Sequence, residues 1–223
     1  MQKFWMVLAG GALASLFASG AFATQYTSQY SDLDFDKCAI IEEDSEVGYV
    51  EWRCPGTYGY DVLASDGDAR LYLAYVPESY VVPQPIDDLL VVEGTKNGEM
   101  PSAEAIVDAE AGVGIGQTIS YFNTAGPKIE WRAANVPDAE PFATIVRYHY
   151  QTQDEEGGFV NNQALVVSRF RFGHSCHVAY IDALANSNAN LMAREVADKF
   201  ANSGDCPEGA VPVLGSGGAA LRF

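Results

Sequence analysis

Apolar and polar residues alternate with a period of two along most of the chain, a pattern typical of half-buried β-strands. Within residues 24–36, for example, Asp32, Asp34 and Asp36 form one face and apolar residues the other. Prolines interrupt the pattern between residues 77 and 101, where only a short strand fits. We expect strands at residues 47–53, 60–64, 70–76, 89–93, 118–123, 128–132, 142–152, 160–172 and 176–183.

Two turn sequences predict β-hairpins. Residues 65–68 read Ser-Asp-Gly-Asp, and Asp-Gly favours the positive φ angles of a tight turn. Residues 154–158 read Asp-Glu-Glu-Gly-Gly and separate two long strand segments. Both turns are expected to join antiparallel neighbours.

One segment has a helical pattern instead. Asn188 can cap a helix over residues 189–202, which stops at Gly204. A shorter helix is expected at residues 102–111, capped by Ser102. The apolar stripe expected on the longer helix consists of Leu191, Met192, Val196 and Phe200.

Many strands and one clear helix predict an α+β fold, mainly an antiparallel β-sheet with one C-terminal helix from Ala189 to Asn202. The length fits a single β-rich globular domain over residues 24–206. Residues 207–223 are rich in Gly and small side chains, so we expect a flexible, disordered tail there.

The N-terminus has the features of a signal peptide. Lys3 is followed by an apolar stretch over residues 4–17 and by Ala21-Phe22-Ala23, an A-x-A cleavage site. A transmembrane anchor is the alternative, but it needs roughly 18 or more apolar residues. We therefore expect cleavage after Ala23 and a periplasmic or secreted mature protein with no membrane span.

The mature chain carries all four cysteines, and an even number in an exported protein indicates disulfides. Three pairings are possible. Cys38–Cys54 and Cys176–Cys206 are favoured because each closes a short loop, whereas the crossed alternatives span the middle of the chain.

The net charge limits the range of partners. The full chain has a formal charge of −17, and loss of Lys3 leaves 12 basic against 30 acidic residues, or −18. Such a charge disfavours binding to nucleic acid and docking on anionic lipid. It permits a cationic protein or peptide as partner, although the alternative is that the charge only maintains solubility.

One tripeptide occurs twice, as Glu51-Trp52-Arg53 and as Glu130-Trp131-Arg132. Duplicated half-domains would explain this repeat. The following residues align poorly, however, so coincidence in a shared strand context is the preferred interpretation.

A metal site and a cofactor are not expected. His174, Cys176 and His177 are metal-ligand types, but a disulfide removes Cys176, and residues 176 and 177 of a strand point to opposite faces. The acidic residues at 32, 34, 36 and 43 have the spacing of a calcium loop, yet Lys37 occupies the position that requires Gly.

Blocks along most of the mature chain resemble a group of uncharacterised exported proteobacterial proteins with a four-cysteine framework. That group has no established activity, so the resemblance implies export, size and the cysteine framework and assigns no catalytic residue. The Gly-rich stretch after Cys206 departs from the group's pattern. The blocks are Leu33, Asp36-Lys37-Cys38, Cys54-Pro55-Gly56, Gly59-Tyr60, Gly67-Asp68-x-Arg70, Glu130-Trp131-Arg132, Pro141-Phe142-Ala143, Arg147-Tyr148-His149, residues 176–183, Ala185-Asn186 and Asn190.

Two function hypotheses remain. The first is a non-catalytic periplasmic binding or interaction protein, because nucleophile and nucleotide-binding motifs are missing and the chain is strongly acidic. The second is a periplasmic hydrolase with His149 or His177 as base and Asp182 or Glu130 as its carboxylate, because an acid–base pair can assemble from distant strands.

Overall fold

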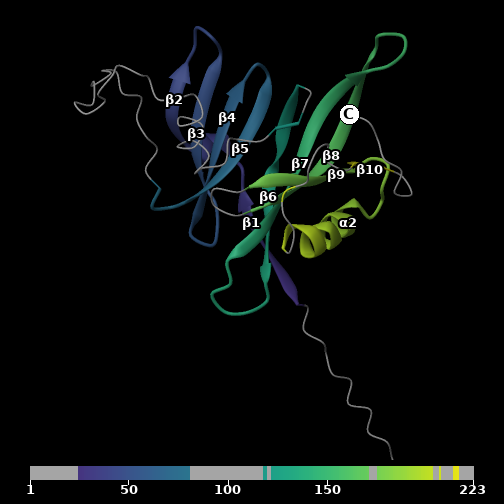
Figure 1. Ribbon diagram of the computed structural model, residues 1–223. Coiled ribbons are helices and arrows are strands. Elements are labelled where there is room, and N and C mark those ends of the chain that lie inside the picture. Colours follow the sequence, from purple (N-terminus) through teal and green to yellow (C-terminus); the bar gives the residue numbers. More distant parts are fainter. Residues whose placement is uncertain are drawn as a thin grey trace, which may run out of the picture.

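Strand pairing divides the protein into two sheets in a computed structural model that describes residues 25–80, 118–119, 122–170, 175–202, 206 and 213–215. Figure 1 shows the two sheets side by side, with the described α-helix on the far side of the larger one. The expected signal peptide, the strand at 89–93, the helix at 102–111 and His174 lie outside the described residues.

The larger sheet has six strands in the order β1-β6-β7-β8-β9-β10, all antiparallel neighbours except β9 and β10. The strands are β1 (Tyr26–Asp32), β6 (Asn123–Ala134), β7 (Pro141–Gln153), β8 (Phe159–Arg169), β9 (Cys176–Asp182) and β10 (Val213–Leu214).

The smaller sheet is a meander of four antiparallel strands: β2 (Ala39–Asp44), β3 (Tyr49–Pro55), β4 (Tyr60–Gly67) and β5 (Arg70–Pro77). The predicted β4–β5 hairpin is confirmed, but its turn differs in detail. Gly67 pairs with Arg70, so the turn residues are Asp68 and Ala69, with φ of 54° and 55°.

Trp131 of β6 lies fully buried at the centre of the core between the two sheets. Tyr75 of β5 and Phe170, which follows β8, make edge contacts with its ring at 5.2 and 5.8 Å between centroids. Its indole N–H donates to Ser31 Oγ over 2.9 Å. Because side chains alternate between faces, Trp131 joins the two sheets while its neighbours Glu130 and Arg132 point toward the helix.

The helix packs on the sheet through alanines as well as through part of the expected stripe. The helix α2 (Ala189–Val196) continues into a π-helical turn, Ala197–Ala201. Its buried residues repeat at intervals of four, and Met192 and Val196 of the expected stripe pack beside them. Leu191 of that stripe is 53% exposed. The small alanine side chains allow a close approach to the sheet. The buried set is Ala189, Ala193, Ala197 and Ala201.

Three expected boundaries were wrong. The first strand ends at Asp32, and Phe35–Lys37 form a 3₁₀ turn instead of continuing the alternation. The strand expected at 128–132 is part of β6, which begins at Asn123 and has an irregularity between Ala125 and Ile129. Thr118, Ile119 and Phe122 of the strand expected at 118–123 lie outside any strand. Within the tail expected to be disordered, Val213 and Leu214 pair with β9 as β10.

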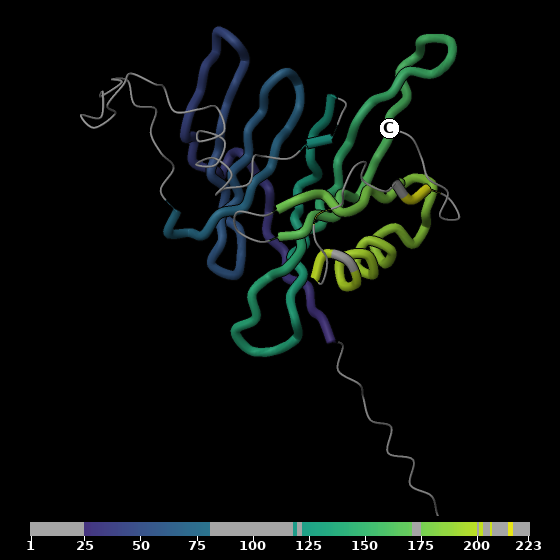
Figure 2. The backbone as a smooth tube through the Cα atoms, viewed as in Figure 1, coloured from purple at the N-terminus to yellow at the C-terminus, as the bar shows by residue number. Residues whose placement is uncertain are grey.

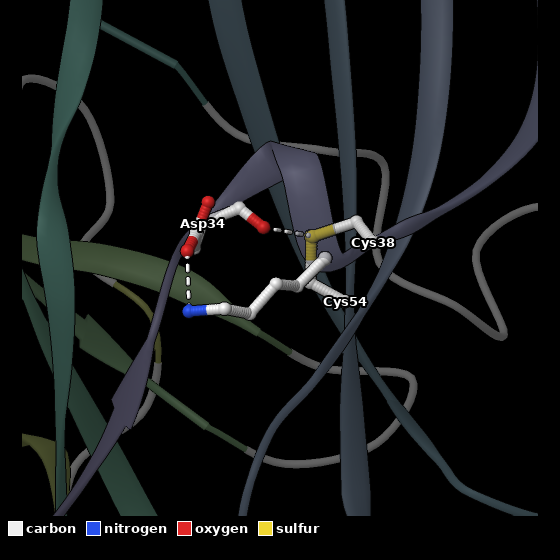
Figure 3. The surroundings of a disulfide bond; sticks show 4 residues. Asp34, Cys38 and Cys54 are labelled. Atoms are coloured by element: carbon white, nitrogen blue, oxygen red, sulfur yellow. Dashed lines mark hydrogen bonds and ion pairs between the residues drawn. A yellow bond between two sulfur atoms is a disulfide. The ribbon is translucent and has the colours of Figure 1, made fainter.

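The two disulfides are those favoured from the sequence, with Cα–Cα distances of 4.4 Å for Cys38–Cys54 and 5.8 Å for Cys176–Cys206. Figure 3 shows the first beside the 3₁₀ turn, where Cys38 Sγ lies 3.2 Å from the carbonyl oxygen of Asp34. This disulfide attaches the turn to β3, and Cys176–Cys206 ties the chain after the helix to β9.

Among the helices that the structure describes, none combines the length and the apolar character required to cross a membrane.

Candidate binding site at the β7–β8 ribbon

The β7–β8 hairpin extends beyond its neighbouring strands. The pairing of β6 with β7 stops at Asn123 and Tyr150, and that of β8 with β9 stops at Ala164 and Asp182. Residues 151–162 therefore form a two-stranded ribbon without a third strand among the described residues, and Figure 2 shows this ribbon projecting from the sheet. We call these residues the acidic ribbon.

The tip of the acidic ribbon is held by its own hydrogen bonds. Asp154 accepts the backbone N–H groups of Glu156 and Gly158 at its Oδ1, at 3.0 and 2.7 Å. Gly157 has a φ of 82°, a value that glycine adopts without strain. Gln151 also donates from its side chain to Asn161 across the strands over 2.8 Å. The tip is thus ordered before any partner binds.

The surface of the acidic ribbon combines one large apolar side chain with negative charge. Phe159 is 72% exposed, and Val160 is also exposed. Asp154, Glu155 and Glu156 provide three carboxylates, and residues 151–162 include no Lys or Arg. None of these twelve residues belongs to a core cluster, so packing does not account for the exposed phenyl ring.

A pocket of about 600 Å³ lies at the base of the acidic ribbon, next to the β4–β5 turn. We call it the base pocket. Phe122, 62% exposed, is its large aromatic side chain. Both sheets contribute to the lining, which consists of Asp66, Ala69, Phe122, Asn123, Thr124, His149, Tyr150, Gln151, Asn161, Asn162 and Gln163.

Asp66 is the one carboxylate among the described residues that line the base pocket. Val62 and Ala64 of the same strand face the core between the sheets, so strand alternation places Asp66 on that face too, at its open end. Its side chain is half-buried and makes no hydrogen bond or ion pair with any described residue. Partial burial raises the pKa of the Asp66 carboxyl above its usual range.

His149 is the sequence-predicted residue that lies in the base pocket, where its ring is exposed. Glu130 lies elsewhere. It pairs with Ile145, four residues before His149 along β7, which corresponds to roughly 13 Å at a strand rise of about 3.3 Å per residue. That separation is too large for a hydrogen bond between the two side chains.

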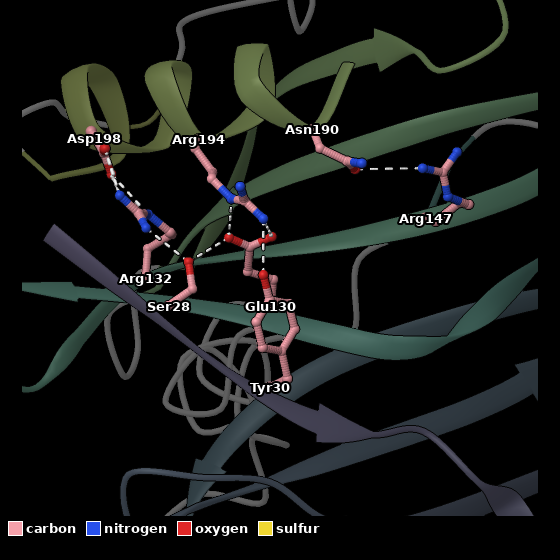
Figure 4. A network of polar contacts seen from close by, with 8 residues as sticks. All are labelled: Ser28, Tyr30, Glu130, Arg132, Arg147, Asn190, Arg194 and Asp198. Atoms are coloured by element: carbon pink, nitrogen blue, oxygen red, sulfur yellow. Dashed lines mark hydrogen bonds and ion pairs between the residues drawn. The ribbon is translucent and has the colours of Figure 1, made fainter. Parts of the chain in front are cut away.

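Glu130 is bound to the helix instead, as Figure 4 shows. Its carboxylate accepts hydrogen bonds from Arg194 Nε at 2.6 Å and from the Ser28 hydroxyl at 2.5 Å. The same arginine donates to the Tyr30 hydroxyl. Arg132 and Asp198 form a second ion pair beside it. These contacts attach the helix to β1 and β6, and they explain the polar character of Glu130 without a catalytic role.

His177 and Asp182 also have structural partners. His177 is buried, its Nδ1 lies 2.9 Å from the Tyr180 hydroxyl, and burial lowers its pKa to about 4. Asp182 accepts the backbone N–H groups of Leu184 and Ala185 at 2.8 Å each, which fixes the turn before the helix. Across the described residues, no hydrogen bond joins either histidine to Glu130 or Asp182.

Sequence reasoning missed the role of Asp66 and the pocket around it. Asp66 was interpreted as a turn residue, because Asp-Gly is a common turn sequence. The informative feature was the spacing from Val62 and Ala64, which indicates that Asp66 shares their inward face. That spacing becomes meaningful only once the two sheets are known to face each other. Over the described part of the chain, no group of three or more His, Cys, Asp or Glu side chains is placed to hold a metal ion.

Comparisons of the chain with protein-family models, curated proteins and solved structures found no match.

Proposed function

We propose that this protein is a non-catalytic exported binding protein, periplasmic or secreted, that contacts a cationic protein or peptide through the acidic ribbon. The observation that carries the proposal is Phe159, exposed beside three carboxylates with no basic residue in the ribbon. Aromatic side chains are enriched at interface centres, and charge complementarity accelerates association.

The order of the ribbon supports this proposal. A loop that must become ordered on binding loses affinity, whereas a preorganised one does not. The contacts of Asp154 and the Gln151–Asn161 hydrogen bond keep the tip in one conformation. The overall negative charge of the chain adds a long-range attraction for a basic partner.

The experiment uses a lysozyme, as a basic cell-wall lytic enzyme, and measures association and dissociation by biolayer interferometry at several salt concentrations. Glu155→Gln/Glu156→Gln should lower the association rate constant about tenfold at low salt and weaken its salt dependence. Phe159→Ser should raise the dissociation rate constant by roughly tenfold.

The matched control is Glu42→Gln/Glu43→Gln, which removes the same charge from the exposed edge strand β2. This control should keep both rate constants of the unmodified protein. If it slows association as much as the ribbon variant, the net charge acts without a defined surface. Binding that is unchanged in both ribbon variants would refute the proposal.

The hydrolase alternative is favoured by one observation, since His149 and Asp66 line the same pocket. A histidine and a carboxylate near a bound substrate can act as base and acid. Turnover of p-nitrophenyl acetate or p-nitrophenyl phosphate, abolished by His149→Asn, would support hydrolysis. Equal rates for the variant and the unmodified protein would leave the binding function as the better proposal.

A further inference from the structure

The half-buried carboxylate of Asp66 makes no hydrogen bond or ion pair with any described residue. Arg70, on the neighbouring strand, contacts Asp68 at 3.7 Å and lies over the Phe122 ring at 5.9 Å, while Arg147 donates to Gln163 of the pocket lining over 3.0 Å. Asp66 therefore bears the cost of partial desolvation without a counterion among the described residues.

A second acceptor faces the same space from the opposite sheet. Ala164 and Val166 of β8 point into the core between the sheets, so strand alternation places Asn162 on the same face of β8. Asp66 lies on the corresponding inward face of β4. The amide nitrogen of Asn162 donates to the Thr152 hydroxyl at 2.9 Å and to the Val160 carbonyl at 3.0 Å. Its carbonyl oxygen remains the group that can accept a hydrogen bond from a ligand.

These groups match one ligand chemistry. A primary ammonium group is a compact cation with three donors and no acceptor, and it requires oxygen acceptors and a counterion. The exposed Phe122 ring in the same lining offers an apolar surface for the methylene chain of such a group. Among the described residues of the lining, His149 is the one basic side chain; Arg70 lies beside the pocket, over the Phe122 ring, with Asp68 as its partner.

We propose that the base pocket receives a lysine side chain of the cationic partner, with the ammonium group held by Asp66 and Asn162. This inference rests on the proposed function and deepens it. Asn161 and Asn162 belong both to the acidic ribbon and to the pocket lining, so a partner on the ribbon reaches the pocket. The partner's recognition then has two parts, a charged and apolar contact on the ribbon and one inserted lysine.

The test titrates isotopically labelled protein with the capped tripeptide Ala-Lys-Ala and follows amide shifts by NMR. Saturable shifts are expected at Asp66 and Asn162, and the same peptide with norleucine in place of lysine should give none. Asp66→Asn should abolish the shifts at Asn162. Asp68→Asn is the matched control, because it removes the same charge from an exposed neighbour outside the pocket, and it should bind the tripeptide normally.

Asp66→Asn should also raise the melting temperature at neutral pH, because it removes a partly desolvated charge that lacks a counterion. A raised melting temperature shows that the variant is folded, so a loss of binding in Asp66→Asn is not caused by unfolding. Equal binding by Asp66→Asn and the unmodified protein, or equal loss in Asp68→Asn, would overturn the pocket assignment. A free diamine such as cadaverine that binds more tightly than the tripeptide would overturn the assignment to a partner's side chain.

The two proposals can fail separately. Glu155→Gln/Glu156→Gln should bind the lysine tripeptide as the unmodified protein does, because neither residue lines the base pocket. If this variant also keeps its lysozyme kinetics while Asp66→Asn loses the tripeptide, the pocket assignment stands and the ribbon contact is wrong. If the ribbon variant slows the association with lysozyme, and Asp66→Asn leaves the binding of both lysozyme and the tripeptide unchanged, the ribbon contact stands and the pocket assignment is wrong.

Discussion

Arg132 on β6 and Asp198 on the π-helical turn form a bidentate ion pair between the larger sheet and the helix. Arg132 Nε and Nη2 lie 2.9 and 2.7 Å from Asp198 Oδ1, and Nη2 lies 2.6 Å from Oδ2. The arginine side chain is 8% exposed. Its charge is therefore removed from water and depends on this one carboxylate and on the Ser28 hydroxyl.

Asp198→Ala should lower the free energy of unfolding by about 3 kcal/mol, because it leaves the buried charge of Arg132 without its partner. Urea unfolding followed by Trp fluorescence measures the change. The exposed Asp34–Lys37 pair is the control, and Asp34→Ala should have little effect. Equal and small effects at both sites would mean that water reaches Arg132.

Ala193→Leu should destabilise the protein by about 1–3 kcal/mol, because Ala193 is fully buried where the helix meets the sheet and a larger side chain overpacks that contact. Leu191→Ala should change stability by less than about 0.5 kcal/mol, since Leu191 is mostly exposed. The reverse order of these two effects in thermal unfolding would contradict the buried position of Ala193.

His177 should make the protein less stable in acid. Burial lowers its pKa from the usual 6.5 to about 4 in the folded protein, so the unfolded chain binds the proton more tightly. The stability contribution is complete above pH 6.5, falls as the pH drops toward 4, and amounts to roughly 3 kcal/mol at about 1.4 kcal/mol per pKa unit.

His177→Gln tests this contribution, because glutamine has no titrating group. The difference in unfolding free energy between the variant and the unmodified protein should change by up to roughly 3 kcal/mol between pH 7 and pH 4. A constant difference over this range would contradict the buried, neutral state of His177.

Cys38→Ala/Cys54→Ala should lower the free energy of unfolding by about 3 kcal/mol, because the disulfide closes a loop of 16 residues in the unfolded chain. Non-reduced peptide mapping of the unmodified protein should yield the Cys38–Cys54 and Cys176–Cys206 peptides. A crossed peptide such as Cys54–Cys176 would contradict both the structure and the short-loop argument.

The hairpins, the position of the helix and both disulfides were predictable, because each depends on residues that are close in sequence or on loop length. The edge strand β2 was missed because its residues, Ala39–Asp44, are mostly exposed and lack regular alternation. Alanine carries a weak hydrophobic signal, so the sequence pattern identified Met192 and Val196 but not the alanines beside them, and it included the exposed Leu191.

The candidate site was predicted only in part, since His149 was identified and Asp66 was not. Glu130 resembled a free acid because its partner Arg194 is 64 residues away in the sequence. Burial and pairing across such separations decide which carboxylate is available to a ligand. The alternation of residues along one strand contains no information about these long-range contacts.

Residues of the acidic ribbon can be substituted without changing the core of the protein. Its twelve residues support no core cluster, so substitutions at Glu155, Glu156 and Phe159 leave the packing of the two sheets and the helix unchanged. The proposed recognition surface and the residues that stabilise the fold thus lie in different parts of the chain. Exchange of a few tip residues would alter the proposed contact, while Trp131 and the alanine face of the helix continue to maintain the same scaffold.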